Sequence, residues 1–270
     1  MTGKIYIHLV RHAQGFHNLT EINQQIPDPD LTALGKEQCA ALRAGFPYQD
    51  KITHLVASPM RRTLYTCLLS FAPAVQAGRV VTALPEIQEV SNLPCDLGTA
   101  PKRLAAEFDD DAARVDLRLL TLTWADKSPG SPWYPDAAKL EARARTARRW
   151  LRDLGTKFLE ENSGADVDAH IVAVTHGGFL HFLSDDFEDI VLDVGTGWNN
   201  AECRTYELKD PTGQDPDAQL SETDASRNRR KDRRTGLDET ERRELRVAYG
   251  DLIKKEFGTP SVELVENVAF

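Results

Sequence analysis

Arg11 and His12 stand directly after a short apolar run, residues 5–10, that is rich in β-branched side chains. Such a run is typical of a strand buried on both faces of a parallel sheet. The strand would present Arg11 and His12 at its carboxyl end, where ligands bind in α/β sheets. A guanidinium fork can hold phosphate oxygens, and an imidazole can attack phosphorus. An Arg-His pair alone is more often structural than catalytic, so its neighbours matter.

A second histidine, His176, occupies the same kind of position. It follows residues 170–175, which form the clearest buried-strand pattern in the chain. Gly177 comes next, and a glycine there allows the backbone to approach a ligand closely. An apolar helix start follows, so we expect His176 at a strand-to-helix turn on the ligand side of the sheet.

Arg62 is placed by a third strand-to-helix unit. Residues 54–57 read as a short strand, and residues 58–72 read as the helix that follows, with a proline in its first turn. Arg61 and Arg62 then fall in the first turn, where a positive charge opposes the helix dipole. Such a local conflict is expected at functional sites, and a bound anion would resolve it.

A carboxylate completes the set. A third strand over residues 80–84 runs into a loop that carries Glu86 and Glu89. The strand ends thus deliver a group of cations, imidazoles and one carboxylate to one edge of one sheet: Arg11, His12, Arg62, Glu89 and His176. This composition suits phosphoryl transfer, in which charge must be neutralised. The sequence contains neither a phosphate-binding P-loop nor a metal-carboxylate cluster, so we expect no metal and no cofactor.

The elements that position these residues alternate between strand and helix, which is typical of an α/β fold. Helices are predicted over residues 33–46, capped by Thr32, and over residues 101–108, 111–122, 137–161 and 238–257. The helix over residues 137–161 has an arginine-rich face, which we interpret as solvated. Residues 203–208 are predicted as a final edge strand.

Residues 92–135 lack strand alternation and are rich in proline and aromatic side chains. An insertion after a sheet strand, on the ligand side, is where a substrate-covering cap would lie. A surface excursion without function explains the same pattern. Both interpretations stay open at the level of sequence.

Composition limits the function classes. The chain has 270 residues, of which 41% are apolar and 28% charged, as in ordinary globular proteins. The net charge of −9 argues against general nucleic-acid binding. Its four cysteines show no zinc-ligand spacing, and we interpret them as reduced thiols. We find no signal peptide and no membrane span, so we expect a soluble, cytoplasmic protein with no membrane partner.

The C-terminal part differs in composition. Residues 211–244 are polar and charged, and they include a basic run over residues 227–234. The run is compatible with a nuclear-import or nucleic-acid patch, but the acidic residues around it favour a solvated linker. We therefore predict a catalytic domain over residues 1–210 and a charged linker with a helical extension over residues 211–270.

Three separated segments resemble the signature segments of the histidine phosphatase superfamily, the phosphoglycerate mutase-like proteins: Leu9-Val10-Arg11-His12-Ala13, Ser58-Pro59-Met60-Arg61-Arg62-Thr63 with Thr66, and Val174-Thr175-His176-Gly177-Gly178. The resemblance spans about residues 4–208. It implies that His12 is the phosphorylated nucleophile and that Arg11, Arg62 and His176 hold the phosphate. It also implies that Asn18 orients substrate or phosphate, and that Glu89 is the acid, with Glu86 as a rival.

The departures from the family pattern bear on activity. Ala13 stands where the family usually has glycine, a change that we expect to matter little. Residues 14–29 lack the serine and the Asn-rich, Trp-containing stretch with which glycolytic mutases position their substrate. The resemblance therefore favours a phosphatase acting on a small-molecule phosphate ester. Mutase-type phosphoryl transfer, and a non-catalytic binding module on the same fold, are the alternatives.

We accordingly expect a three-layer α/β/α sandwich with a doubly wound, mostly parallel sheet, a helical insertion at residues 92–135 and a C-terminal extension. The substrate and the oligomeric state are not determined by the sequence.

Overall fold

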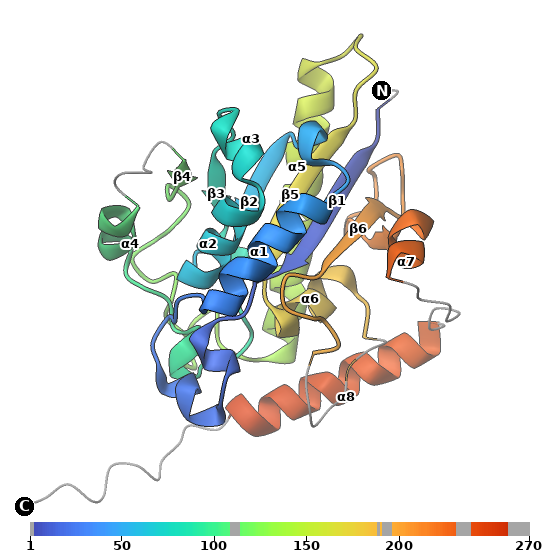
Figure 1. Ribbon diagram of the computed structural model, residues 1–270. Coiled ribbons are helices and arrows are strands. Elements are labelled where there is room, and N and C mark those ends of the chain that lie inside the picture. The colour runs from blue at the N-terminus through green and yellow to red at the C-terminus, as the bar shows by residue number, and fades with distance from the viewer. Residues whose placement is uncertain (1–2, 109–113, 188–189, 191–195, 231–238, 259–270) are drawn as a thin grey trace, which may run out of the picture.

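A seven-stranded sheet forms the centre of the described part of the protein (Figure 1). The computed structural model describes residues 3–108, 114–187, 190, 196–230 and 239–258. The strand order is β4-β3-β2-β5-β1-β6-β7. The strands are β1 (Ile5–Arg11), β2 (His54–Ala57), β3 (Val81–Ala83), β4 (Val115–Asp116), β5 (Ala169–Thr175), β6 (Cys203–Leu208) and β7 (Leu220–Glu222). Strands β1 to β5 pair in parallel, whereas β6 and β7 are antiparallel to their neighbours.

Helices cover both faces of this sheet. They are α1 (Ala33–Gly45), α2 (Arg61–Ser70), α3 (Ala72–Gln76), α4 (Pro101–Glu107), α5 (Ala137–Glu161), α6 (Gly177–Ser184), α7 (Asp224–Arg229) and α8 (Glu239–Phe257). Helices α5 and α6 pack on one face, and α2 and α3 pack on the other, with α1 against α2 (Figure 1). The predicted three-layer, doubly wound fold is confirmed.

The central strand β5 shows why the fold has two cores. All of its residues are buried, and successive side chains point to opposite faces of the sheet. Ile171 and Ala173 join the core beneath α5 and α6, whereas Val172 and Val174 join the core beneath α2. A strand with helices on both sides therefore needs a continuous apolar run, and that run is the pattern read from the sequence.

Most of the predicted helices are confirmed. The helix expected over residues 33–46 is α1, and the Thr32 side chain accepts a hydrogen bond from the amide of Gly35 at 3.0 Å. The helices expected over residues 137–161 and 101–108 are α5 and α4. The helix expected over residues 58–72 begins only at Arg61 and ends at Ser70.

The helix predicted over residues 111–122 is wrong for residues 114–122. Val115 and Asp116 form β4 instead, and turns follow. The reason is the open edge of β3, whose amide and carbonyl groups need partners. The amide of Val81 donates to the carbonyl of Arg114 at 2.7 Å, so pairing with the sheet overrides local helical pattern.

Strand β6 is not at the edge of the sheet, contrary to the prediction. Strand β7 pairs with its outer side, and α7 follows within the segment that the sequence suggested was a linker. Glu222 of β7 is buried and forms an ion pair with Arg230 at 2.7 Å, and Arg229 donates to Thr205 at 3.0 Å. The start of the basic run thus binds to the fold, while residues 231–234 lie outside the described residues. The domain division at residue 210 stays a prediction.

The solvated arginine face predicted on α5 is wrong for two residues, Arg143 and Arg148. Both are buried. Arg148 donates to the carbonyls of Asp217 at 2.9 Å and Phe182 at 3.0 Å. Backbone carbonyls accept hydrogen bonds from both guanidinium groups, although Nε and Nη1 of Arg143 have no partner among the described residues.

Membrane insertion has no support among the described helices, since none of them is both long and apolar enough to cross a bilayer. The four cysteines are free thiols in the structure. Their sulfur atoms therefore carry no cross-link that holds the fold together, and the two cores do so instead.

Candidate active site

The site lies where three neighbouring parallel strands end. Strands β1, β5 and β2 lie side by side, and their carboxyl ends lead to His12, His176 and Ser58. Backbone hydrogen bonds fix this alignment: the His12 amide donates to the Thr175 carbonyl at 2.9 Å, and the Ser58 amide donates to the Val174 carbonyl at 2.9 Å. Residues far apart in the sequence thus meet at one edge of the sheet.

His12 has the protonation pattern of a nucleophile. Its ring is buried, and its Nδ1 lies 2.8 Å from the carbonyl oxygen of Ala13. A carbonyl can only accept, so Nδ1 carries the proton and Nε2 keeps its lone pair. Burial, and next the charge of Arg62, lowers the pKa of His12 well below its ordinary value. The imidazole is therefore neutral at neutral pH.

His176 has the opposite arrangement of protons. Its Nδ1 lies 3.0 Å from Nη2 of Arg62, and a guanidinium can only donate. Nε2 of His176 therefore carries the proton and lies 2.8 Å from the hydroxyl of Ser58. The ring centroids of His12 and His176 are 5.3 Å apart. One imidazole thus offers a lone pair while the other offers an N–H.

Arg62 connects these groups and is itself fully buried. Besides His176, it donates to the carboxylate of Asp96 at 2.8 Å and to the carbonyl of Cys95 at 2.8 Å. Burial alone would raise the pKa of Asp96, but Arg62 and then Lys127 lower it, and the net shift is downward. Asp96 also accepts a hydrogen bond from the Ser91 hydroxyl. The buried guanidinium is therefore paired with a charged carboxylate.

The sequence predicts an unfavourable arrangement at the start of α2, where two positive charges stand at the positive end of the helix dipole. Carboxylates of the protein itself compensate for it. The amide of Arg61 donates to the buried carboxylate of Asp28 at 3.0 Å, and Asp96 neutralises Arg62. Arg61 points elsewhere, because its guanidinium pairs with Glu107 at 2.7 Å. The two adjacent arginines therefore contact different groups, because neighbouring residues of a helix point in different directions from its axis.

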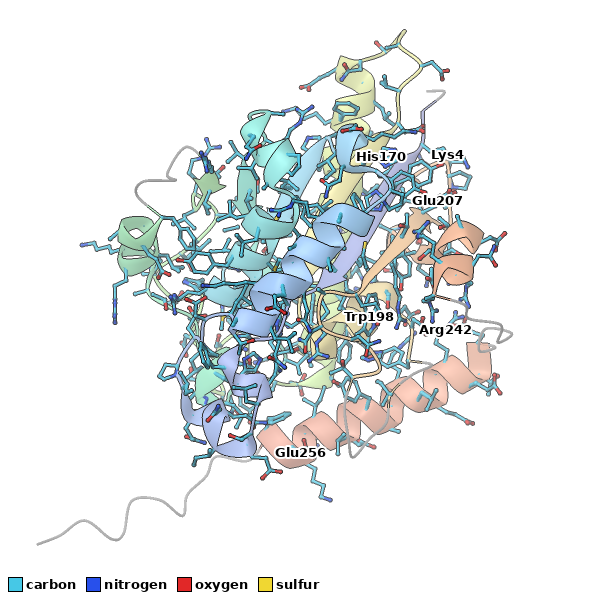
Figure 2. The ribbon with its side chains drawn as sticks, viewed as in Figure 1. Lys4, His170, Trp198, Glu207, Arg242 and Glu256 are labelled. Atoms are coloured by element: carbon cyan, nitrogen blue, oxygen red, sulfur yellow. The ribbon has the colours of Figure 1, made fainter. Side chains whose placement is uncertain are left out.

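Arg11 and Asn18 lie on either side of His12. Arg11 donates through Nη1 to the carbonyl of Trp198, a residue labelled in Figure 2. The side chain of Asn18 is exposed, and its oxygen accepts from the amide of Gly15 at 3.0 Å. Asn18 thus shapes the turn after His12, and its predicted contact with substrate or phosphate stays a prediction.

His17 is a neighbour that the sequence analysis missed. Its ring centroid lies 5.3 Å from that of His12. Burial, with the charge of Arg62 next, lowers the pKa of His17 to about 3. The only signal in the sequence is its place between His12 and Asn18, because no strand or helix pattern leads to it.

Glu89 lies at the N-terminus of α6. Its carboxylate accepts hydrogen bonds from the amides of Val90 and Phe179 at 2.9 Å each, and from the amide of Gly178 at 3.2 Å. Burial, and next the charge of Asp96, raises the pKa of Glu89, although the amide bonds and Arg62 oppose that shift. The pKa values of two carboxyl groups of one site thus shift in opposite directions, because only Asp96 is paired directly with Arg62.

Glu86, the rival carboxylate, lies one short turn earlier, in a 3₁₀ turn formed by Pro85–Ile87. Its charge acts on Arg143. The α6 amides bind Glu89, so the structure brings Glu89 to the strand end of His176. The roles of the two carboxylates stay predictions.

Two buried cations hold the Glu89 loop by its backbone. Lys127, from the insertion, donates to the carbonyls of Glu89 at 2.8 Å and Ser91 at 2.6 Å. Arg143, from α5, donates to the carbonyl of Gln88 at 2.7 Å. Burial lowers the pKa of Lys127 to about 7. The sequence analysis selected neither cation, because their function depends on tertiary contacts that no local pattern encodes.

Gly177 has a packing reason to be glycine. A Cβ atom at Gly177 would lie 2.5 Å from Oγ1 of Thr196, closer than atoms can approach. Its predicted contact with phosphate stays a prediction. Among the residues that the structure describes, no group of three or more His, Cys, Asp and Glu side chains is arranged to hold a metal ion.

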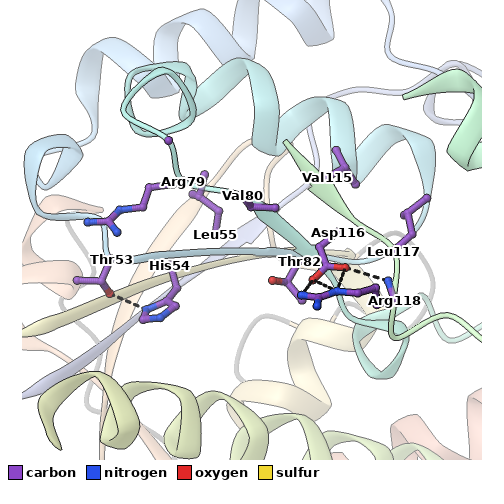
Figure 3. A pocket seen from close by; sticks show the side chains of 11 residues that line it. Thr53, His54, Leu55, Arg79, Val80, Thr82, Val115, Asp116, Leu117 and Arg118 are labelled. Carbon is purple, nitrogen blue, oxygen red and sulfur yellow. Dashed lines mark hydrogen bonds and ion pairs between the residues drawn. The ribbon is translucent and has the colours of Figure 1, made fainter. Parts of the chain in front are cut away.

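A separate cleft lies away from these residues (Figure 3). Thr53, His54 and Arg79 line it, together with an exposed ion pair between Arg118 and Asp116. Thr53 and His54 are at the amino end of β2, whereas Ser58 at the other end of that strand faces His176. The cleft is therefore distinct from the candidate active site, and it contains none of the predicted site residues.

The fold is an α/β/α sandwich, and its strand ends bring together two histidines, two arginines and a carboxylate. Together the fold and these side chains define a class of proteins whose site is built around histidine. The chain belongs to the histidine phosphatase superfamily (branch 1), whose sequence profile matches residues 7–219. The resemblance found in the sequence is thereby confirmed.

Individual relatives are distant. A phosphoglycerate mutase-like protein of Arabidopsis thaliana is 24% identical over 242 aligned residues, covering 76% of this chain and 84% of the relative. Among solved structures, Mycobacterial hydrolase 1 has a TM-score of 0.50 at 20% identity, over 81% of this chain and 97% of its own. Mycobacterial hydrolase 2 has a TM-score of 0.50 at 18% identity, over 90% and 97%. At these identities the solved structures support the fold alone.

The buried histidines predict a loss of stability in mild acid. The pKa of each of the seven histidines is lowered in the folded protein, chiefly by burial. Below the ordinary histidine pKa the unfolded chain then binds more protons than the native state, so the free energy of unfolding falls as the pH falls. We expect the Tm to drop between about pH 7 and about pH 5.5, above the range where ordinary carboxylates titrate.

The control is His12→Asn, which keeps a donor for the Ala13 carbonyl but cannot titrate. Its Tm should fall less over the same pH interval than that of the wild type. Glu89 and Asp28, whose raised pKa values act in the opposite sense, are two groups against seven. A Tm that stays constant over this interval would contradict the prediction.

Proposed function

We propose that this protein is a phosphatase that hydrolyses a small-molecule phosphate monoester through a phosphohistidine on His12, without a metal ion. The observation that carries the proposal is the pair of imidazoles around Arg62. His12 has a neutral Nε2 lone pair, and His176 has an Nε2–H that is directed at the Ser58 hydroxyl 2.8 Å away. The ring centroids of the two histidines are 5.3 Å apart. A phosphoryl oxygen that displaced the Ser58 hydroxyl would accept the N–H of His176 while Nε2 of His12 faced phosphorus.

The first half-reaction transfers the phosphoryl group to the protein. Nε2 of His12 attacks phosphorus, the N–P bond forms, and the bond from phosphorus to the ester oxygen breaks. The proton of Glu89 passes to the leaving oxygen, so the alcohol departs neutral. The raised pKa of Glu89 favours this role, because an acid must hold its proton near working pH.

The second half-reaction returns the protein to its starting state. Water attacks phosphorus, Glu89 accepts the proton that water loses, and the N–P bond breaks to release inorganic phosphate. Arg11, Arg62 and His176 stabilise the charge on the phosphoryl oxygens in both steps. The neutral His12 is regenerated with its Nδ1 proton still bound to the Ala13 carbonyl.

Two buried donors support phosphate binding. The Nε atoms of Arg11 and Arg62 have no hydrogen-bond partner among the described residues. Buried donors without partners are rare in folded proteins, because each costs desolvation energy. A phosphate dianion supplies acceptors of the geometry that guanidinium groups bind best.

The first prediction concerns the intermediate. Incubation with a reactive phosphate ester and rapid quenching in alkali should reveal a phosphoryl adduct on His12 by intact mass and peptide mapping. The adduct should be acid-labile, as an N–P bond is, and turnover should persist in EDTA because the cations of the site belong to the protein.

The matched control is His17→Asn, which removes the neighbouring imidazole but should leave the adduct intact, whereas His12→Asn should abolish it. Activity that vanishes in EDTA and returns with Mg²⁺ or Zn²⁺ would overturn the metal-free proposal. Transfer of the phosphoryl group to a second alcohol instead of water would identify mutase-type chemistry.

The second prediction separates the adjacent arginines. Arg11→Ala and Arg62→Ala should each lower kcat by on the order of a hundredfold or more, since each removes charge from the transferring group. Arg61→Ala should be far milder, because Arg61 pairs with Glu107 and Asp30 at 2.7 and 3.3 Å. Circular dichroism should confirm that each variant folds, since Arg62 is also part of a buried pair. Equal losses at Arg61 and Arg62 would show that the wrong arginine has been assigned.

The third prediction concerns the acid. Glu89→Gln should spare p-nitrophenyl phosphate, whose phenolate leaves without a proton, and should strongly reduce hydrolysis of an alkyl phosphate, whose alkoxide does not. Glu86→Gln is the matched control and should be near neutral for both esters. If Glu86→Gln gives the split and Glu89→Gln does not, the two carboxylates have exchanged roles.

A further inference from the structure

Helix α8 is attached to the edge of the molecule at which the candidate site lies. It is outside residues 7–219 that match the family, and it runs along the carboxyl ends of the sheet beside α6 (Figure 1). Arg242 and Glu256, labelled in Figure 2, mark its two ends. The family match therefore does not account for the helix, although it is close to the site.

Contacts to three elements fix the position of α8. Arg246 forms an ion pair at 2.5 Å with Asp185, which directly follows α6. The carbonyl of Phe257 accepts from the side chain of Asn92 in the insertion at 3.2 Å. A Cβ atom at Gly250 would lie only 2.9 Å from Cβ of Ala137 at the start of α5, so the two helices touch closely there. The helix is docked along its length.

Tyr249 is the residue of α8 that reaches the site. Its ring packs against Phe182 and Phe187, with centroids 5.6 and 6.2 Å away. Its hydroxyl continues past this cluster to the N-terminus of α6. A Cβ atom at Gly178 would lie 3.0 Å from the Tyr249 hydroxyl and 2.7 Å from Oε1 of Glu89. The two oxygens therefore both lie next to the position that a side chain at residue 178 would occupy.

We propose that α8 completes the active site, with Tyr249 as a positioning residue that covers the Glu89 carboxyl and excludes water from it. The inference rests on the proposed role of Glu89 as the acid. It assigns to the C-terminal extension a part in catalysis that residues 7–219 alone do not supply. Glycine at position 178 is required by the same arrangement, since any side chain there would occupy the space between the carboxyl and the hydroxyl.

The charges around Glu89 show what the cover does. The ionisable groups that act on this carboxyl come from the strand ends, the insertion and α5: Arg11, Arg62, Cys95, Asp96, Lys127 and Arg143. Tyr249 adds no charge, because burial, and next the charge of Glu89, raises the pKa of its hydroxyl. Its contribution is the exclusion of water, which disfavours the carboxylate form of Glu89. Opening this side should therefore lower the pKa of Glu89.

A direct titration of the carboxyl tests the inference without any substrate. The full chain is labelled with ¹³C at the glutamate carboxyl carbons, and Glu89→Gln identifies the resonance of Glu89. Tyr249→Ala should shift the titration of that resonance to lower pH, whereas Tyr249→Phe, which keeps the ring, should restore most of the wild-type value. Leu245→Ala is the control, since it removes a partly buried side chain of α8 that packs on the same core.

The kinetic consequence is a shift in the pH profile. With an alkyl phosphate, the alkaline limb of kcat should move to lower pH in Tyr249→Ala, and kcat at neutral pH should fall by on the order of tenfold. With p-nitrophenyl phosphate, the same variant should change little. If wild-type protein hydrolyses no ester, the proposed function fails, and the carboxyl titration still decides the role of α8.

A second variant keeps the test decisive if Tyr249→Ala does not fold. Arg246→Ala releases α8 from Asp185 without altering Tyr249, and it should shift the Glu89 titration in the same direction. An unchanged Glu89 titration in both variants would overturn the inference. An equal shift in Leu245→Ala would do so as well, since it would show that any loosening of the core has this effect.

Discussion

A positive charge buried without any solvent exposure is the constraint on which this structure depends. Arg62 is fully buried at the start of α2, and an unpaired guanidinium in that place would cost several kcal/mol. The protein compensates with Asp96, the carbonyl of Cys95 and Nδ1 of His176. These partners come from the loop after β3 and from the end of β5, so satisfying one charge fixes the relative positions of three segments of the chain.

The charge of Arg62 also influences the protonation states of the groups around it. Arg62 disfavours a proton on His12 and His176, which burial already keeps neutral, and it holds a charge on Asp96. Burial, and next the charge of Asp96, raises the pKa of Glu89 against the lowering effect of the backbone amides and of Arg62. A neutral imidazole at His12 and a raised pKa at Glu89 are what the proposed mechanism requires before substrate binds. Burial favours the neutral form of both groups, whereas Arg62 favours the neutral form of His12 and opposes that of Glu89.

The sequence predicted the parts of the site that lie directly at strand ends. His12 and His176 follow buried runs whose pattern is local, and parallel pairing then brings them together. Asp96, Lys127 and Arg143 escaped the prediction because their importance comes from partners distant in sequence, and nothing in their neighbours marks them. The helix expected beyond residue 111 failed for a related reason, since pairing with the open edge of β3 outweighed local pattern. What the sequence could predict was therefore limited by contacts between residues distant in the chain, and not by weak local patterns.

This contrast also separates the two halves of the proposed chemistry. The nucleophile and the phosphate-binding cations stand on the ends of strands and at the start of a helix, so the sheet itself makes them rigid. The acid stands in a loop that has no ladder of hydrogen bonds of its own, and it must be held by Lys127, by Arg143 and by the amides of α6. Parts of the chain added to the sheet, the insertion and α8, therefore gather around the acid. Changes in the insertion or in α8 can therefore alter which leaving group the acid serves. The residues that bind the phosphoryl group are held by the sheet and need not change.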